Sequence, residues 1–285
     1  MSVVGTRGGV SVVTADRDGA PPAVSVLMSV YDGAPFVAQA VASVLAQADP
    51  DLELIVVDDG STDATPALLA AVADPRLRVQ RQVRTGLTRA LNRALGLARA
   101  PLIARLDADD LALPERLGRQ RAFLAAHPEV GLLGTAAREE DPSGTLVRVV
   151  RPPEDDRALR RALIRANPFV HSSVMMRREL LAQAGGYDER LAVAQDYELW
   201  MRLAGRTGLA NVGEVLVVRR LGARRVSVER EEDRLRTEAR VRWRAVASGA
   251  YPPWCALFAL RPVLALALPR PLRRAMRSAV AGSRA

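Results

Sequence analysis

The sequence predicts an α/β fold with a mostly parallel sheet that is covered by helices. Short apolar runs rich in β-branched residues alternate with longer amphipathic stretches through the first half of the chain. Two of these runs, Leu52–Val57 and Leu102–Leu106, end directly in aspartates. Strands that alternate with helices favour parallel pairing, and ligands then bind beyond the carboxyl ends of the strands. We therefore expect the chemistry at these two acidic strand ends.

The expected elements follow this alternation along the chain. Strands are expected at Val24–Val30, Leu52–Val57, Leu77–Gln80, Leu102–Leu106 and Val130–Leu133. Helices are expected at Phe36–Ala46, Ala64–Val72, Leu87–Ala98 and from Pro114 to Ala126, where a proline suits the first turn. The less regular second half predicts helices at Asp156–Arg165, Asp196–Ala204 and Glu229–Ala247, and strand-like segments at Val170–Met176 and Leu209–Arg219.

The length of 285 residues suits one large domain with a C-terminal extension. We expect a flexible leader over residues 1–22, which lacks the apolar run of a signal peptide, a main domain over 23–228 and a helical extension over 229–285. The single cysteine, Cys255, excludes an intrachain disulfide.

The formal net charge of +9 comes from a chain in which all 41 basic residues are arginine. A basic protein can bind nucleic acid or an anionic membrane surface. Aromatic residues make up only 4% of the chain, and no nucleic-acid-binding motif is present. We therefore expect no nucleic-acid partner.

The first acidic strand end reads Val56-Val57-Asp58-Asp59-Gly60-Ser61-Thr62-Asp63. Gly60 permits a tight turn, and Thr62 or Asp63 can cap the next helix. A capped turn explains Asp63 but leaves Asp58 and Asp59 without a role. A carboxylate at this position can accept a hydrogen bond from a base N–H, as in recognition of a uracil-type ring.

The second acidic strand end reads Leu106-Asp107-Ala108-Asp109-Asp110. In extended backbone the side chains of residues i and i+2 point the same way, so Asp107 and Asp109 can converge. A hard divalent cation such as Mg²⁺ or Mn²⁺ would relieve their repulsion and favours oxygen ligands. The alternative is a solvated acidic turn that precedes the helix at Pro114.

A third motif, Gln195-Asp196-Tyr197-Glu198, lies at an expected helix start. An aspartate there is an ordinary N-cap, which is one interpretation of Asp196. Beside a metal site, Asp196 is also a candidate general base.

Together these motifs resemble glycosyltransferase family 2, the inverting enzymes of the GT-A fold, over about residues 24–227. The resemblance also rests on the opening segment Val24–Gly33, the segment Thr85–Asn92, the Pro114-Glu115-Arg116-Leu117 helix start and the segment His171–Met175. It implies a nucleotide-sugar donor (a UDP-, GDP- or dTDP-sugar), a divalent metal (Mn²⁺ or Mg²⁺) and a glycan, lipid-linked or small-molecule acceptor.

The resemblance also implies roles for individual residues. The metal would be held by Asp109 with help from Asp107, and Asp196 would be the catalytic base. Residues 23–112 would form the nucleotide-sugar half and 113–228 the acceptor half. The nucleotide would be contacted by Ser29, Tyr31, Asp32, Asp58, Asp59, Arg89 and Asp107. The acceptor or phosphate side would include His171, Asp110 and Trp200.

Three of these residues have a simpler interpretation that stays open at this point. Arg89 also suits a solvated helix face in a chain so rich in arginine. His171 also suits a structural histidine, and Trp200 a core position.

The chain departs from the family pattern in three places. The common Tyr-Asn-Gly loop reads Tyr31-Asp32-Gly33, and the catalytic Glu-Asp pair reads Gln195-Asp196. A frequent Arg-x-His pattern reads Arg219-Arg220-Leu221, so a histidine near the metal is missing. The Gln-x-x-Arg-Trp motif and long membrane spans of the processive synthases are also absent, which favours addition of a single sugar.

The C-terminal extension contains an apolar segment, Trp254–Leu268, that is interrupted by Arg261 and Pro262. It is too short and too broken to span a bilayer. Arginines follow it at positions 270, 273, 274 and 277, so it can lie on an anionic membrane surface. The alternative is a helix packed on the main domain. We expect a cytoplasmic protein, with the inner face of the plasma membrane as its site if the surface interpretation holds.

The expected function is sugar transfer to an acceptor hydroxyl in the synthesis of a cell-surface polysaccharide or glycoconjugate. One rival is a nucleotidyltransferase that makes sugar nucleotides, but the segment Ser29–Pro35 lacks the Gly-rich, Arg-containing loop of that class. The other rival is a non-catalytic interaction protein, against which the intact Asp107, Asp109 and Asp196 argue.

Overall fold

The computed structural model describes residues 20–222 and 230–269. Residues 1–19 of the expected leader lie outside this part of the chain. So do the four arginines from 270 onward that contributed to the membrane-surface interpretation.

Within residues 20–222 and 230–269, the sheet has nine strands in the order β3-β2-β1-β4-β8-β6-β9-β5, and β7 pairs with β6. The strands are β1 Val24–Val30, β2 Leu52–Asp58, β3 Leu77–Arg81, β4 Leu102–Arg105, β5 Leu111–Ala112, β6 Val130–Glu140, β7 Leu146–Val150, β8 Met175–Arg177 and β9 Gly208–Arg220. The first four are mutually parallel, as expected, whereas β8 pairs antiparallel with both β4 and β6. The predicted α/β class is confirmed, and the sheet becomes mixed in its second half.

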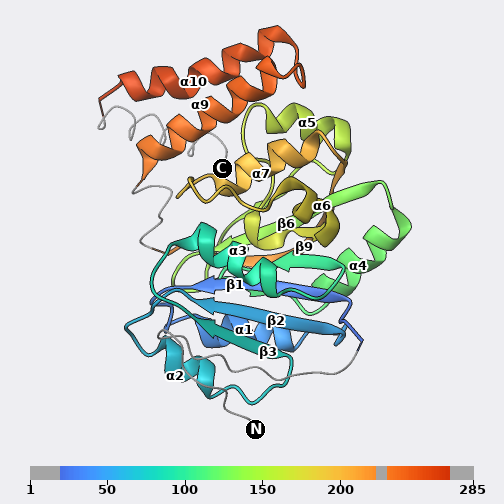
Figure 1. Ribbon diagram of the computed structural model, residues 1–285, viewed down its shortest axis with the longest axis vertical. Helices are drawn as coiled ribbons and strands as arrows, with labels where there is room; N and C mark the ends of the chain where they lie inside the picture. The colour runs from blue at the N-terminus through green and yellow to red at the C-terminus, as the bar shows by residue number, and fades with distance from the viewer. Residues whose placement is uncertain (1–19, 223–229, 270–285) are drawn as a thin grey trace.

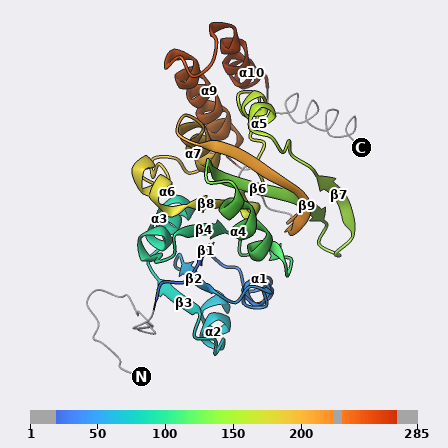
Figure 2. The same cartoon turned by 90° about the vertical axis from the view of Figure 1, so that its right-hand side faces the viewer.

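Helices cover both faces of the sheet (Figure 2). They are α1 Val37–Leu45, α2 Thr65–Ala70, α3 Leu87–Leu97, α4 Arg116–Ala126, α5 Asp156–Leu163, α6 Arg178–Ala184, α7 Gln195–Ala204, α9 Glu231–Ala247 and α10 Ala256–Ala267. The alternation of strand side chains separates two apolar clusters. Leu27 of β1 belongs to the cluster that includes α3 and α7, and Val26 and Met28 to the cluster that includes α1 and α4.

The segment 170–176 differs from its expected strand. It forms a 3₁₀ turn at His171–Ser173, and β8 follows with only three residues. The hydroxyl of Ser173 donates to the carbonyl of Val170 and accepts from the amide of Thr135. Such side-chain bonds satisfy the backbone locally and compete with strand pairing. The turn places this segment at the carboxyl end of β4, where the site lies.

The C-terminal helices form a hairpin at the end of the molecule opposite α2 (Figure 1). The inner helix α9 rests on α7, where the buried guanidinium of Arg242 donates to the hydroxyl of Tyr197. The outer helix α10 packs against α9. Within the described residues, no helix is both long enough and apolar enough to cross a bilayer.

Candidate active site

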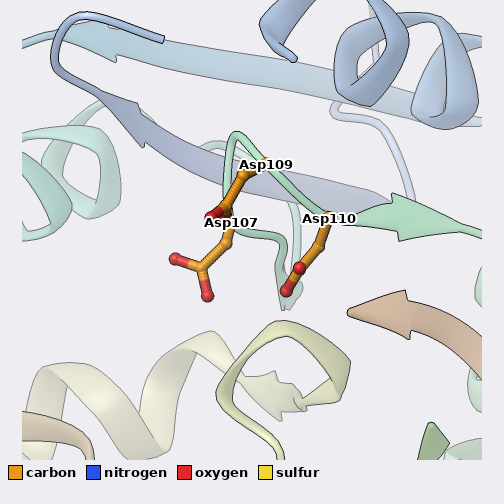
Figure 3. Close-up of side chains that lie close together, drawn as sticks. All are labelled: Asp107, Asp109 and Asp110. Carbon is orange, nitrogen blue, oxygen red and sulfur yellow. The ribbon is translucent and has the colours of Figure 1, made fainter. Parts of the chain in front are cut away.

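Three carboxylates gather on the turn that follows β4 (Figure 3). One ligand oxygen each from Asp107, Asp109 and Asp110 lies within 4.8 Å of the others. The backbone turns here, with the amide of Asp110 3.2 Å from the carbonyl oxygen of Asp107. The convergence therefore comes from a turn and not from the extended backbone that we assumed, and this is why Asp110 joins the other two.

The charges of this acidic turn are only partly compensated. Burial, followed by the charge of Asp107, raises the pKa of Asp109, and burial with both neighbouring carboxylates raises the pKa of Asp110 to about 7. Burial acts most strongly on Asp107 and raises its pKa, but the charge of the buried Arg105 guanidinium, together with the Ser172 hydroxyl and other contacts, lowers that pKa to about 2. Crowded carboxylate oxygens with raised pKa values fit a hard divalent cation.

Two other segments hold the acidic turn in place. The hydroxyl of Ser172, in the 3₁₀ turn, is 2.6 Å from a carboxylate oxygen of Asp107 and also hydrogen-bonds Asp110. The amide of Arg220, at the end of β9, donates to Asp110 over 3.0 Å. The Arg219-Arg220-Leu221 segment, which departs from the family pattern, thus contacts the site through its backbone.

Asp196 is the second residue of α7 and faces the same region. The helix follows Ala194, which has a left-handed φ of 56°, and no side chain caps it. The N-cap interpretation of Asp196 is therefore wrong. Instead, the amide of Asn167 donates to the Asp196 carboxylate over 2.7 Å. Burial raises the pKa of Asp196, and the charge of Asp107 raises it further. A half-buried carboxylate with a raised pKa beside a charged site suits a general base.

The rings of His171 and Trp200 contact each other, and His171 also contacts Tyr187. The Nε2 atom of His171 is 3.0 Å from the hydroxyl of Tyr187. Burial, followed by the charge of Arg105, lowers the pKa of His171 to about 3, so the ring is neutral at pH 7. Trp200 is fully buried, with the rings of Phe169 and His171 each 6.0 Å away. Trp200 is thus a core residue, which corrects its assignment to the acceptor side.

The turn after β2 uses its two aspartates differently. The carboxylate of Asp59 is buried and accepts hydrogen bonds from the side chain of Gln82 and from the amides of Thr85 and Gly86, at 2.7, 2.8 and 2.7 Å. Asp58 accepts from the amide of Ser61 over 2.9 Å. Asp59 thus holds the 82–86 loop against β2, and contact of either carboxylate with a base stays a prediction.

Glycine is required at position 60 of the same turn. Gly60 has a φ of +83°, and a Cβ atom there would lie 2.8 Å from the backbone nitrogen of Arg84. The side chain of Asp63 accepts from the amide of Thr65, the first residue of α2, and from the amide of Ala34, while the N-cap position of α2 is Ala64 and has no side-chain cap.

The remaining nucleotide-side residues lie at the end of β1. Tyr31 is exposed, and the guanidinium of Arg84 covers its ring at 3.7 Å. Asp32 has a φ of +49° and accepts from the amide of Thr62, while Ser29 is half-buried in β1. Nucleotide contacts by Ser29, Tyr31 and Asp32 stay predictions.

Arg89, on α3, forms an exposed ion pair with Glu189 at 3.4 Å. This contact favours the solvated helix face over a diphosphate contact.

Sequence patterns missed four residues that organise the site: Arg84, Arg105, Asn167 and Ser172. Ser172 lies inside the segment His171–Met175 on which the resemblance rests, and Asn167 lies just before it, but neither side chain was assigned a role. Arg84 and Arg105 carried no usable signal because arginine is abundant throughout the chain.

Comparison with known proteins shows the family of this chain. The family model described as glycosyl transferase family 2 matches residues 25–185. The putative glycosyltransferase EpsE of Bacillus subtilis is 33% identical over 64% of this chain and 66% of its own length. The amylovoran biosynthesis glycosyltransferase AmsE of Erwinia amylovora is 32% identical over 66% of this chain and 72% of its own length.

Two solved structures share the fold. The mannosyltransferase PcManGT from Pyrobaculum calidifontis, in complex with GDP-Man and Mn²⁺, has a TM-score of 0.62 at 23% identity and covers 92% of this chain and 80% of its own. TarS 1–349 of S. aureus, in complex with UDP-GlcNAc, has a TM-score of 0.62 at 21% identity and covers 76% of this chain. The chain spans about two thirds of the length of EpsE and of TarS 1–349, at 66% of each. Because the family model matches more than half of the chain, this protein belongs to glycosyltransferase family 2, and its fold is the GT-A fold.

Proposed function

We propose that this protein is an inverting glycosyltransferase that moves a sugar from a nucleoside-diphosphate sugar to an acceptor hydroxyl. The observation that carries the proposal is the three-carboxylate turn. The charge of Asp107, in this turn, raises the pKa of the half-buried Asp196. The turn suits the diphosphate end of a donor, and Asp196 suits the acceptor end. Membership of family 2 supports the pairing of these two roles.

Asp107, Asp109 and Asp110 are the residues that would hold Mn²⁺ or Mg²⁺. When bound, such an ion supplies positive charge that offsets the charge of the departing diphosphate. The chain prepares this position with Ser172 and the Arg220 amide, which fix the direction of the carboxylates.

Asp196 would accept the proton of the acceptor hydroxyl as that oxygen attacks the anomeric carbon. A new bond forms between the acceptor oxygen and the anomeric carbon, while the bond from that carbon to the diphosphate oxygen breaks and its electron pair leaves with the diphosphate. Attack from the face opposite the leaving group inverts the configuration. Asn167 donates to one carboxylate oxygen of Asp196 and so helps to hold the side chain in place for this role.

The donor would be a UDP-, GDP- or dTDP-sugar whose base lies near Tyr31 and the Asp58-Asp59 turn. TarS 1–349 was solved with UDP-GlcNAc and PcManGT with GDP-Man, which supports a nucleotide-sugar donor without selecting the base. The similarity to AmsE, named for amylovoran biosynthesis, supports a role in cell-surface glycan synthesis. We place the reaction in the cytoplasm.

A two-step experiment tests the proposal. Nucleotide sugars are first screened for a rise in melting temperature with and without Mn²⁺; a donor at 100 times its Kd stabilises the folded state by about 2.7 kcal/mol. The best donor is then incubated with candidate acceptors, and the released nucleotide is identified. Nucleoside diphosphate with a glycosylated product is expected. Pyrophosphate release would show a nucleotidyltransferase instead, and failure of every nucleotide sugar to stabilise the protein would contradict the proposal.

A further inference from the structure

Helix α10 exposes a row of large apolar side chains. Leu257, Leu260 and Leu264 are 64%, 48% and 66% exposed, and Trp254, just before the helix, is 59% exposed. Steps of three and four residues place these side chains on one face of a helix. The other face packs on α9 through the buried Ala259 and Pro262. We call the exposed row, Trp254, Leu257, Leu260 and Leu264, the α10 stripe.

The net positive charge of the chain lies in the same part of the sequence, after Glu238. No aspartate or glutamate follows Glu238, whereas nine of the 41 arginines do. The other 32 arginines are balanced by the 32 acidic residues, so the part of the chain after Glu238 accounts for the whole formal net charge of +9. One of these arginines, Arg261, is exposed and follows Leu260 of the stripe directly. A neutral catalytic part is thus joined to a strongly cationic C-terminal part.

We propose that the α10 stripe binds the surface of an anionic lipid bilayer. An amphipathic helix that lies in the interface buries its apolar face among the acyl chains, and flanking arginines contact anionic headgroups. A tryptophan at the end of the stripe suits the headgroup level. With twelve residues, α10 is about 18 Å long, which is too short to cross the ~30 Å hydrocarbon layer.

Charge also favours a bilayer over a second copy of this chain as the partner that binds the α10 stripe. A second copy docked on the stripe would bring another Arg261, and another cationic C-terminal part, against the first, so the stripe is poorly suited to self-association. An anionic bilayer complements both the apolar row and the positive charge. This inference does not depend on the proposed transferase activity, because none of the stripe residues belongs to the acidic turn or to α7.

The test is co-sedimentation of the full chain with vesicles. Phosphatidylcholine vesicles are compared with vesicles that contain 30% phosphatidylglycerol, at about 0.15 M salt. The chain is expected to bind the anionic vesicles at least tenfold more strongly. The double variant Leu257→Gln/Leu264→Gln should lose about tenfold or more of this binding, because two large apolar contacts are removed. Arg261→Gln should lose about fivefold.

The matched control is Leu146→Gln/Val147→Gln on β7, where two apolar side chains are similarly exposed, at 56% and 53%. This control should bind vesicles as the unmodified chain does. All variants should keep the melting temperature of the unmodified chain. Equal binding of both vesicle types, or unchanged binding of the stripe variant, would overturn the proposal. A dimer in gel filtration that Leu257→Gln/Leu264→Gln dissociates, without vesicle binding, would assign the stripe to a second copy instead.

Discussion

The turns after β2 and after β4 lie on either side of β1, and both place two or more aspartates after a buried parallel strand. In the turn after β2, the carboxylate of Asp59 is saturated by donors from the 82–86 loop. In the turn after β4, three carboxylates crowd together, and the pKa values of Asp109 and Asp110 are raised. Nearly identical sequence patterns therefore lead to two different structures: a carboxylate that anchors a loop and carboxylates that suit a cation.

The difference teaches that the supply of donors, and not the number of acids, distinguishes a structural turn from a binding site. A carboxylate that is fully hydrogen-bonded stabilises the loop that surrounds it. Carboxylates that repel one another are retained at a cost in stability, which an added cation can remove. Substitutions in the first turn should therefore affect stability most, and substitutions in the second turn should affect activity most.

The largest expected effect is at Asp109. Asp109→Asn keeps the shape but removes a ligand charge, so we expect turnover to fall by about 10³-fold, on the scale of several kcal/mol of metal assistance. The unfolding free energy should stay unchanged or rise, because a like charge is removed. Initial rates with Mn²⁺ and urea denaturation of the same preparation measure both. Asp141→Asn, in an exposed turn, is the matched control and should keep full activity. Full activity of Asp109→Asn, or of the unmodified enzyme in excess EDTA, would remove the metal role.

The next effect is at Asp196 of α7. Asp196→Asn should lower the transfer rate by about 10²-fold or more, because an amide cannot accept the hydroxyl proton. Donor affinity should be nearly unchanged, since the nucleotide contacts are expected in residues 24–110. Transfer rate and donor Kd are measured together, with Asp188→Asn, whose carboxylate pairs with Arg190, as the control. Near-normal transfer by Asp196→Asn would exclude it as the base.

A smaller effect, on stability and not on activity, is expected in the turn after β2. Asp59→Ala leaves the amides of Thr85 and Gly86 and the side chain of Gln82 without their acceptor. We expect the unfolding free energy to fall by about 3 kcal/mol, the scale of unsatisfied buried donors. Urea denaturation measures this loss. If Asp59→Ala were as stable as Asp109→Asn, the contrast between the two turns would not hold.

The smallest effect concerns pH. Asp196 must be ionised to accept a proton, and its raised pKa means that activity is lost as the pH falls through a value above the ordinary 3.8. Asn167 donates to the ionised carboxylate and lowers this pKa, so Asn167→Ala should move the acid limb of kcat/KM to higher pH. Gln183→Ala, which removes an exposed bond to Glu179, should leave the profile in place. An unshifted profile in Asn167→Ala would show that Asn167 does not set the pKa of the base.

The sequence by itself determined the order of strands and helices from β1 to β4, the helix α4 and the position of both acidic turns, but not the two-residue strand β5. These features depend on local patterns: β-branched runs that favour strands, a glycine at φ +83° and aspartates that follow a buried strand. The sequence could not predict that Asp59 is fully hydrogen-bonded, although its donors lie in one loop about 25 residues on. Backbone amides are present at nearly every position, so their role as donors gives no sequence pattern.

Only the tertiary structure decided how the site is assembled. Strand β8 pairs antiparallel beside β4, and this brings Ser172 to Asp107 across 65 positions of sequence. The same packing sets Asn167 against Asp196 and the end of β9 against Asp110. These contacts join segments whose local patterns are independent of one another. Their geometry, and the pKa shifts that burial and neighbouring charges produce, exist only once the sheet is complete and water is excluded from its edge.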